Sequence, residues 1–72
     1  MRITYDSEAD ALHIRLVEGI HQCRCLRLND WVTLDIGPNE SLVGIEVIDA
    51  SEAMGEGAAP TVLLENVLAR SA

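Results

Sequence analysis

Apolar and polar residues alternate along the first two thirds of the chain, in short runs bounded by residues that favour turns. In residues 11–16, Leu12, Ile14 and Leu16 fall on one side, whereas His13 and Arg15 fall on the other. A period of two is typical of β-strands that bury one face. The pattern predicts five strands, over residues 2–5, 11–16, 21–28, 31–36 and 42–48.

The segments between these strands are short, which predicts an antiparallel meander in which each strand pairs with the next one along the chain. Four opposed pairs set the register: Tyr5 with Leu12, Leu16 with His21, Leu28 with Trp31, and Ile36 with Val43. Because directly opposed side chains share a face, this register gathers one almost entirely apolar face. Its apolar members are Ile3, Tyr5, Leu12, Ile14, Leu16, Cys23, Cys25, Val32, Leu34, Ile36, Val43, Ile45 and Val47.

The longest apolar run, residues 42–50, ends the predicted sheet and leads into the helical part of the chain. Asp49 and Glu52 have the spacing of a capping box, with Asp49 at the N-cap. Gly55 is placed to end this short helical turn. After a linker and a proline, an apolar stripe predicts a second helix over residues 61–70.

These elements predict a single α+β domain over residues 1–72, with the sheet over about 2–48 and the helical tail over about 49–70. A ten-residue helix is about 15 Å long, whereas five strands span about 24 Å. The helix cannot cover the whole apolar face, so we expect a homodimer in which a second copy covers the rest. Gly44 leaves a gap in the last strand, which Trp31, Leu42 or a partner side chain is expected to fill.

The charge balance narrows the classes of partner. Twelve acidic residues stand against five arginines and no lysine, for a formal net charge of −7. Phosphate contacts dominate nucleic-acid affinity, so this balance argues against nucleic-acid binding and favours a basic protein partner. No apolar run approaches the roughly 20 residues of a membrane span, and the first residues do not resemble an export signal. We therefore expect a cytoplasmic protein that does not bind membranes.

The acidic residues at the first turn have the composition of a calcium site. Asp6, Glu8 and Asp10 match the start of a calcium-binding loop, which requires Gly at its sixth position and Glu at its twelfth. Those positions hold Ala11 and Val17. The preferred interpretation is that these acids bind backbone amides of the turn.

The cysteines and histidines offer further candidates. Cys23 and Cys25 would lie parallel on a strand, so two free thiols in a reducing compartment are expected. On a strand, His21 and Cys25 would be about 13 Å apart, too far for one zinc ion, although the two cysteines with a ligand from elsewhere remain an alternative. His13 lacks a triad partner at a suitable spacing, and Asp35 would meet it only through an accident of folding. We predict no catalytic residue, cofactor or metal.

One group of basic residues suggests an alternative function. In the predicted register Arg2, His13, Arg15 and Arg24 share the more polar face of the sheet. Arginine forks bind carboxylates and phosphates, so this face is a candidate site for an anion or small ligand. The leading hypothesis is a non-catalytic interaction module that forms homodimers and binds a basic protein.

Two blocks of the sequence resemble a known family. The first reads Ile3-Thr4-Tyr5-Asp6-Ser7-Glu8-Ala9-Asp10-Ala11-Leu12-His13-Ile14-Arg15-Leu16, and the second reads Leu42-Val43-Gly44-Ile45-Glu46-Val47-Ile48-Asp49-Ala50-Ser51. Both are similar to the opening and closing blocks of the domain of unknown function 2283 family of short prokaryotic proteins, and Asp35 fits an aspartate usual on the preceding strand. The resemblance covers roughly residues 2–52, and residues 21–28 match less well. It implies a small α+β fold and supplies no activity.

Overall fold

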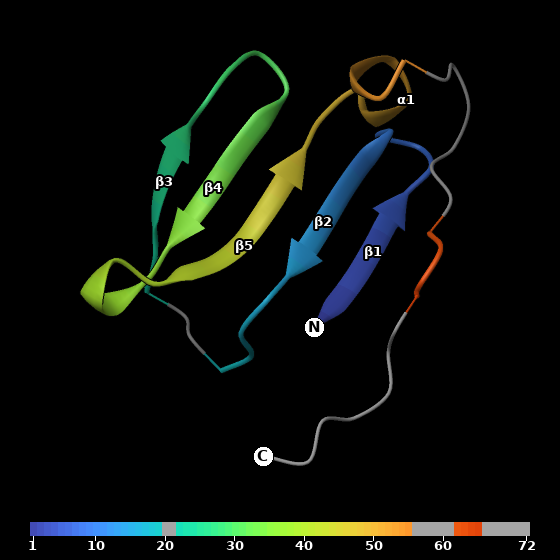
Figure 1. The fold of residues 1–72 in the computed structure, drawn as a ribbon. Coiled ribbons are helices and arrows are strands. Elements are labelled where there is room, and N and C mark those ends of the chain that lie inside the picture. The colour runs from blue at the N-terminus through green and yellow to red at the C-terminus, as the bar shows by residue number, and fades with distance from the viewer. Residues whose placement is uncertain (20–21, 56–61, 66–72) are drawn as a thin grey trace.

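The computed structural model describes residues 1–19, 22–55 and 62–65 of the chain. Within them the chain forms a five-stranded antiparallel sheet followed by one short helix (Figure 1). The elements are β1 (Arg2–Asp6), β2 (Ala11–Arg15), β3 (Arg24–Arg27), β4 (Val32–Ile36), the 3-10 turn η1 (Pro38–Glu40), β5 (Leu42–Val47) and α1 (Ala50–Ala53). The predicted strands and the short helical turn are therefore confirmed, with the third strand shorter than expected.

The order of the strands across the sheet is β1-β2-β5-β4-β3, so the predicted meander is wrong (Figure 1). The strand next to β2 is β5, so the expected pairing of β2 with β3 does not form. The physical reason lies in the apolar character of β5. Val43 is fully buried and Val47 is nine-tenths buried, and a strand with such side chains is better covered at the centre of a sheet, between two neighbours, than at its edge.

The β3–β4 hairpin is offset by one residue from the prediction. The side-chain oxygen of Asn29 accepts hydrogen bonds from the backbone N–H groups of Trp31 (2.9 Å) and Val32 (2.8 Å). These bonds draw Trp31 into the turn, so the N–H of Leu28 bonds to the carbonyl of Val32 (2.9 Å). The predicted opposition of Leu28 and Trp31 is therefore wrong.

This offset exchanges the two faces of β3, because a shift of one residue moves every side chain to the other side. Leu26 lies opposite Leu34 on the apolar face, and Cys25 lies opposite Asp35 on the polar face. Cys23 and Cys25 are both free and exposed. The prediction of free thiols is confirmed, and the predicted burial of the cysteines in the core is wrong.

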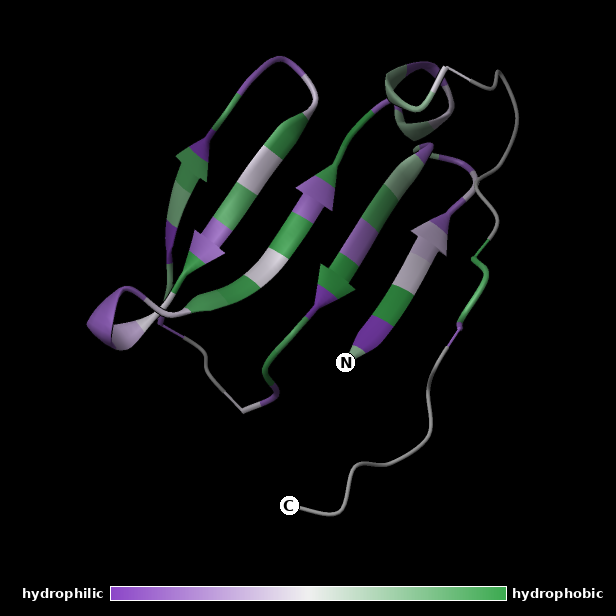
Figure 2. Cartoon of the chain, viewed as in Figure 1, coloured by the Kyte–Doolittle hydropathy of each residue, from purple (hydrophilic) through white to green (hydrophobic). Residues whose placement is uncertain are grey.

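The remaining apolar face follows the prediction, although the strand order does not. The ladders place two rows of apolar residues directly opposite one another: Tyr5, Leu12, Val47 and Val32 in one row, and Ile3, Ile14, Ile45, Leu34 and Leu26 in the other. Alternating hydropathy is visible along β2 and β4 in Figure 2, whereas β3 has two apolar residues in succession. Near the start of β5 a bulge pairs Ile36 with Leu42 and not with Val43.

The helix α1 packs on one end of this apolar face. Ala50 is fully buried against Leu12 and Val47, and Ala53 packs at the edge of the same cluster. These contacts lie at the β1, β2 and β5 side of the sheet, whereas Leu26 on β3 is 42% exposed. The described helix therefore covers only part of the apolar face.

The N-terminus of α1 is capped by a residue distant in sequence, so the predicted capping box is wrong. Asp49 has φ 48° and its side chain makes no capping hydrogen bond. Instead, the carboxylate of Asp10 accepts hydrogen bonds from the Ser51 hydroxyl (2.6 Å) and the Ser51 N–H (3.2 Å). The Asp10 carbonyl accepts the N–H of Ala50 (2.8 Å), and the Tyr5 hydroxyl donates to the Asp10 carboxylate (2.6 Å). The first turn and the helix are thus joined through one aspartate.

The predicted helix over residues 61–70 is not confirmed. Residues 62–65 are not helical, and the other residues of that range lie outside the described part of the chain. Where the chain is described, no helix has both the length and the apolar character that crossing a membrane requires.

Candidate functional site

Four side chains with acid–base or ligand chemistry converge on the polar face of the sheet, the side away from α1. They are His13 of β2, Cys25 of β3, Asp35 of β4 and Glu46 of β5, and we refer to them as the polar cluster. His13 is directly opposite Glu46, and Cys25 is directly opposite Asp35. The cluster exists because β5 lies between β2 and β4, which brings residues from four neighbouring strands to one place.

Gly44 provides the space in which the cluster forms. It lies opposite Asp35 in the β4–β5 ladder. A Cβ atom at Gly44 would be 3.0 Å from Oδ2 of Asp35 and 3.3 Å from Nε2 of His13. The gap predicted at this glycine is therefore filled by Asp35 and His13, and not by the expected Trp31, Leu42 or partner side chain.

Asp35 is the buried centre of the cluster, with a relative exposure of 8%. The thiol of Cys25 donates a weak hydrogen bond to its Oδ1 (3.6 Å). Nε2 of His13 lies 3.7 Å from its Oδ2, which is longer than a hydrogen bond. That nitrogen is itself buried and has no hydrogen-bond partner. A buried carboxylate and a buried imidazole nitrogen therefore face each other without a hydrogen bond between them.

The pKa values of two members show the effect of Asp35. Its hydrogen bond with Cys25 raises the pKa of the thiol, and burial adds to this effect. Glu46 also has a raised pKa, because of its hydrogen bond with Asp35, followed by burial and by repulsion from the Asp35 charge. The electrostatic effect of His13 opposes that of Asp35 and lowers the pKa of Glu46. Asp35 thus favours the protonated forms of Cys25 and Glu46.

Three members have the spacing of metal ligands. The ligand atoms of Cys25, Asp35 and Glu46 all lie within 4.8 Å of one another. For zinc, the sequence suggested the cysteines with His21, which lies outside the described residues, or the two cysteines with an unnamed ligand from elsewhere. The combination of Cys25 with Asp35 and Glu46 was missed, because it depends on both the strand order and the offset of β3.

The four residues of the anion hypothesis are only partly brought together. Arg2 lies directly opposite Arg15, and His13 is on the same face of β2. Arg24 lies on the outer strand β3, three strands away from β2. The offset of β3 places it on the same face as Leu26, so the prediction that it shares the polar face is wrong. Arg2 is paired with Glu18 (3.4 Å), and the Nε–H group of Arg15 donates to a backbone carbonyl. Anion binding at Arg2, His13, Arg15 and Arg24 stays a prediction.

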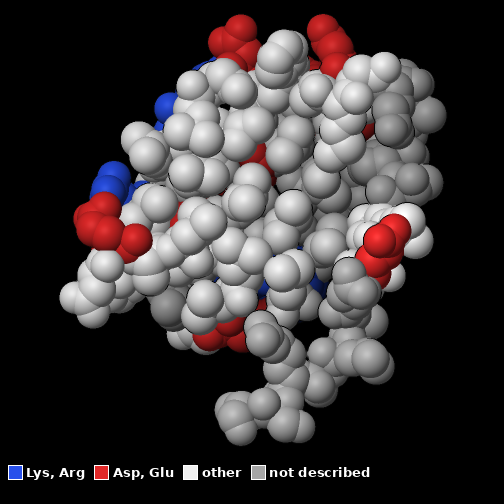
Figure 3. Space-filling model, in the orientation of Figure 1, with Lys and Arg blue, Asp and Glu red and all other residues white. Residues whose placement is uncertain are grey.

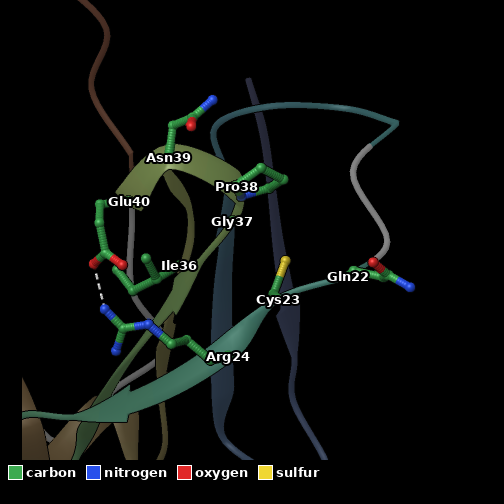
Figure 4. Close-up of a pocket in the computed structure, with 8 residues that line it drawn as sticks. All are labelled: Gln22, Cys23, Arg24, Ile36, Gly37, Pro38, Asn39 and Glu40. Carbon is green, nitrogen blue, oxygen red and sulfur yellow. Dashed lines mark hydrogen bonds and ion pairs between the residues drawn. The ribbon is translucent and has the colours of Figure 1, made fainter.

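Arg24 instead borders a shallow hollow of about 440 Å³ between the start of β3 and η1. Figure 4 shows its ion pair with Glu40 at one side of the hollow, and Cys23 and Pro38 at another. Arg24 is the one cationic side chain among the described residues that line the hollow, and it is paired with Glu40, so the chemistry of the hollow does not favour an anion.

The acidic turn has the structural role that the sequence suggested. The carboxylate of Asp6 accepts hydrogen bonds from the N–H groups of Glu8 (3.0 Å) and Ala9 (3.3 Å). Asp10 binds α1, and its hydrogen bonds with Ser51 and Tyr5 hold its pKa below the usual range. The hydrogen bond between Tyr5 and Asp10 raises the pKa of the Tyr5 hydroxyl.

The fold and its two sheet faces define a small five-stranded antiparallel protein with one short capped helix. The model of the family described as "Protein of unknown function (DUF2283)" matches residues 2–51, and the chain belongs to this family. The match ends at Ser51, the residue that binds Asp10, so it includes both partners of the helix cap. Searches among the curated proteins and among the solved structures found no match.

Proposed function

We propose that the chain is a non-catalytic interaction module that forms a homodimer through the uncovered part of its apolar sheet face. The observation that carries this proposal is the exposure of apolar residues on and beside the outer strand β3. Leu26 is 42% exposed and Leu28 is 57% exposed, whereas the other end of the face is covered by α1. Burial of such a patch is a favourable driving force for association.

The small core supports the same proposal. Among the described residues, the buried large apolar side chains are Leu12, Ile36, Val43 and Val47. Exposed large apolar side chains are more numerous: Met1, Val17, Leu26, Leu28, Trp31, Leu42, Ile48, Met54, Val62, Leu63 and Leu64. Domains of this size often gain stability from a partner subunit, and a second copy is the simplest one.

We further propose a basic protein as the partner of the dimer and the cytoplasm as its location. The net charge is −7, and the acidic side chains in the view of Figure 3 lie mainly around the rim, with uncharged atoms over much of the centre. Such a rim would attract a basic surface over a distance and set its orientation. Two free thiols suit a reducing compartment.

Oligomeric state tests the dimer directly. The parent should have twice the chain mass in light scattering coupled to size exclusion at micromolar concentration, and Leu26→Asp should have the mass of one chain. Ile48→Asp is the matched control, because Ile48 is 50% exposed and follows β5 on the side opposite the apolar face. A parent of single mass, or equal dissociation of both variants, would refute the proposed interface.

A further inference from the structure

We propose that the polar cluster binds a divalent transition-metal ion of the zinc class, with Cys25, Asp35 and Glu46 as ligands and His13 as the fourth. This site is separate from the proposed dimer interface, because it lies on the opposite face of the sheet. The two proposals can therefore fail independently.

The donor atoms select the class of ion. Zinc is bound in proteins by thiolate sulfur, imidazole nitrogen and carboxylate oxygen, and the cluster offers all three. Calcium and magnesium prefer sites made of oxygen atoms alone. A thiol and an imidazole beside two carboxyl groups therefore favour zinc and its chemical relatives over the alkaline-earth ions.

The distances are close to those that an ion requires. Ligand atoms around a tetrahedral zinc ion are about 3.3–3.8 Å apart, given bonds of about 2.0–2.3 Å. The ligand atoms of Cys25, Asp35 and Glu46 are within 4.8 Å of one another, and Nε2 of His13 is 3.7 Å from Asp35. Contraction by about 1 Å would bring the ligand atoms of Cys25, Asp35 and Glu46 to this spacing. His13 would approach the ion from the side of Asp35, the ligand that it already lies beside. All four residues lie on paired strands, which hold them in position.

The burial and charge of the cluster are an independent reason to expect a bound cation. Asp35 is more than nine-tenths buried, yet its neighbours are a weak thiol donor and a second carboxyl group. The buried Nε2 atom of His13 points to the same place and has no hydrogen-bond partner. Buried charges are normally paired or coordinate a metal. A divalent cation would compensate the carboxylates and use the free imidazole nitrogen.

Binding would exchange protons for the ion without any redox change. The thiol of Cys25 would lose its proton to solvent and form the metal–sulfur bond as a thiolate. Any proton held by Glu46 would be released in the same way. The oxidation state of the ion and of the sulfur would stay the same.

Cobalt(II) provides the direct test, because a thiolate bound to cobalt has a charge-transfer band in the near ultraviolet. The full chain, reduced and freed of metal, should bind one equivalent of cobalt with this band, and zinc should displace it. Cys25→Ser should lose the band, and Glu46→Gln should bind cobalt more than about tenfold more weakly. Cys23→Ser is the matched control, because Cys23 is also a free, exposed thiol. It should keep the band.

Three results would overturn the site: no stoichiometric binding by the parent, a band that survives in Cys25→Ser, or a band lost in Cys23→Ser. Circular dichroism of each metal-free variant checks that it is folded. If Cys25→Ser is unfolded, the Glu46→Gln titration decides, and unchanged affinity in that variant contradicts the proposal.

Discussion

Replacement of Gly44 by alanine tests whether the close approach of β4 and β2 side chains above β5 shapes this fold. The new Cβ would lie 3.0 Å from Oδ2 of Asp35, 3.2 Å from the carbonyl oxygen of Ile14 and 3.3 Å from Nε2 of His13. The Ile14 carbonyl belongs to the backbone of β2, so it cannot move without disturbing the sheet. The carboxylate of Asp35 would have to rotate away from its buried position.

The expected magnitude combines two opposing effects. Overpacking of this kind lowers the free energy of unfolding by about 1–3 kcal/mol. Alanine also reduces the conformational entropy of the unfolded chain, which offsets about 0.4–1 kcal/mol of this loss. We expect a net loss of about 1–2 kcal/mol in the free energy of unfolding, or a fall of roughly 5–15 °C in Tm. Urea and thermal unfolding followed by circular dichroism, in metal-free buffer, would measure it.

A second background identifies the contact that causes the loss. In Asp35→Ala the nearest obstacle is absent, so Gly44→Ala should cost less there, with a coupling energy of about 0.5–2 kcal/mol. Equal stability of Gly44→Ala and the parent would refute the argument that this glycine is needed for close approach. An equal cost in both backgrounds would show that Asp35 is not the limiting neighbour.

Two further predictions concern the turns. Hydrogen bonds hold the pKa of Asp10 below its usual value, so its stabilising effect is present at neutral pH and is lost as the pH falls through that lowered pKa. In urea titrations from about pH 7 to about pH 3, the advantage of the parent over Asp10→Asn should therefore shrink, and a constant difference would contradict this role. Asn29→Ala removes two hydrogen bonds of the β3–β4 turn and should lower the free energy of unfolding by about 1–2 kcal/mol. Asp30→Ala should change it little, because that side chain is 94% exposed, and similar losses in the two variants would argue against the Asn29 turn.

The two faces of the sheet have different chemical characters, and each supports a separate proposal. The apolar face is partly covered by α1 and leaves Leu26 exposed. The polar face buries Asp35 beside Cys25 and Glu46. A measurement of oligomeric state addresses the first face, and cobalt binding addresses the second.

The sequence by itself determined where the strands and the short helix lie, and which residues of β1, β2, β4 and β5 share the apolar face. It could do so because the alternation of side chains is a local property with a period of two. The family resemblance over the two end blocks is confirmed as well. The role of Asp6 in its turn followed from the same local chemistry.

Only the tertiary structure decided which strands are neighbours. Pairing joins residues far apart in the chain, and short connections did not reveal that β5 would take the central place between β2 and β4. The side-chain oxygen of Asn29 accepts hydrogen bonds from two backbone N–H groups, and this turn shifts the register of β3 by one residue. Cys25 therefore lies on the polar face. The helix cap by Asp10 and the meeting of His13 with Asp35 over Gly44 depend on the same long-range placement. The candidate site is therefore a product of strand order and register, which local periodicity does not contain.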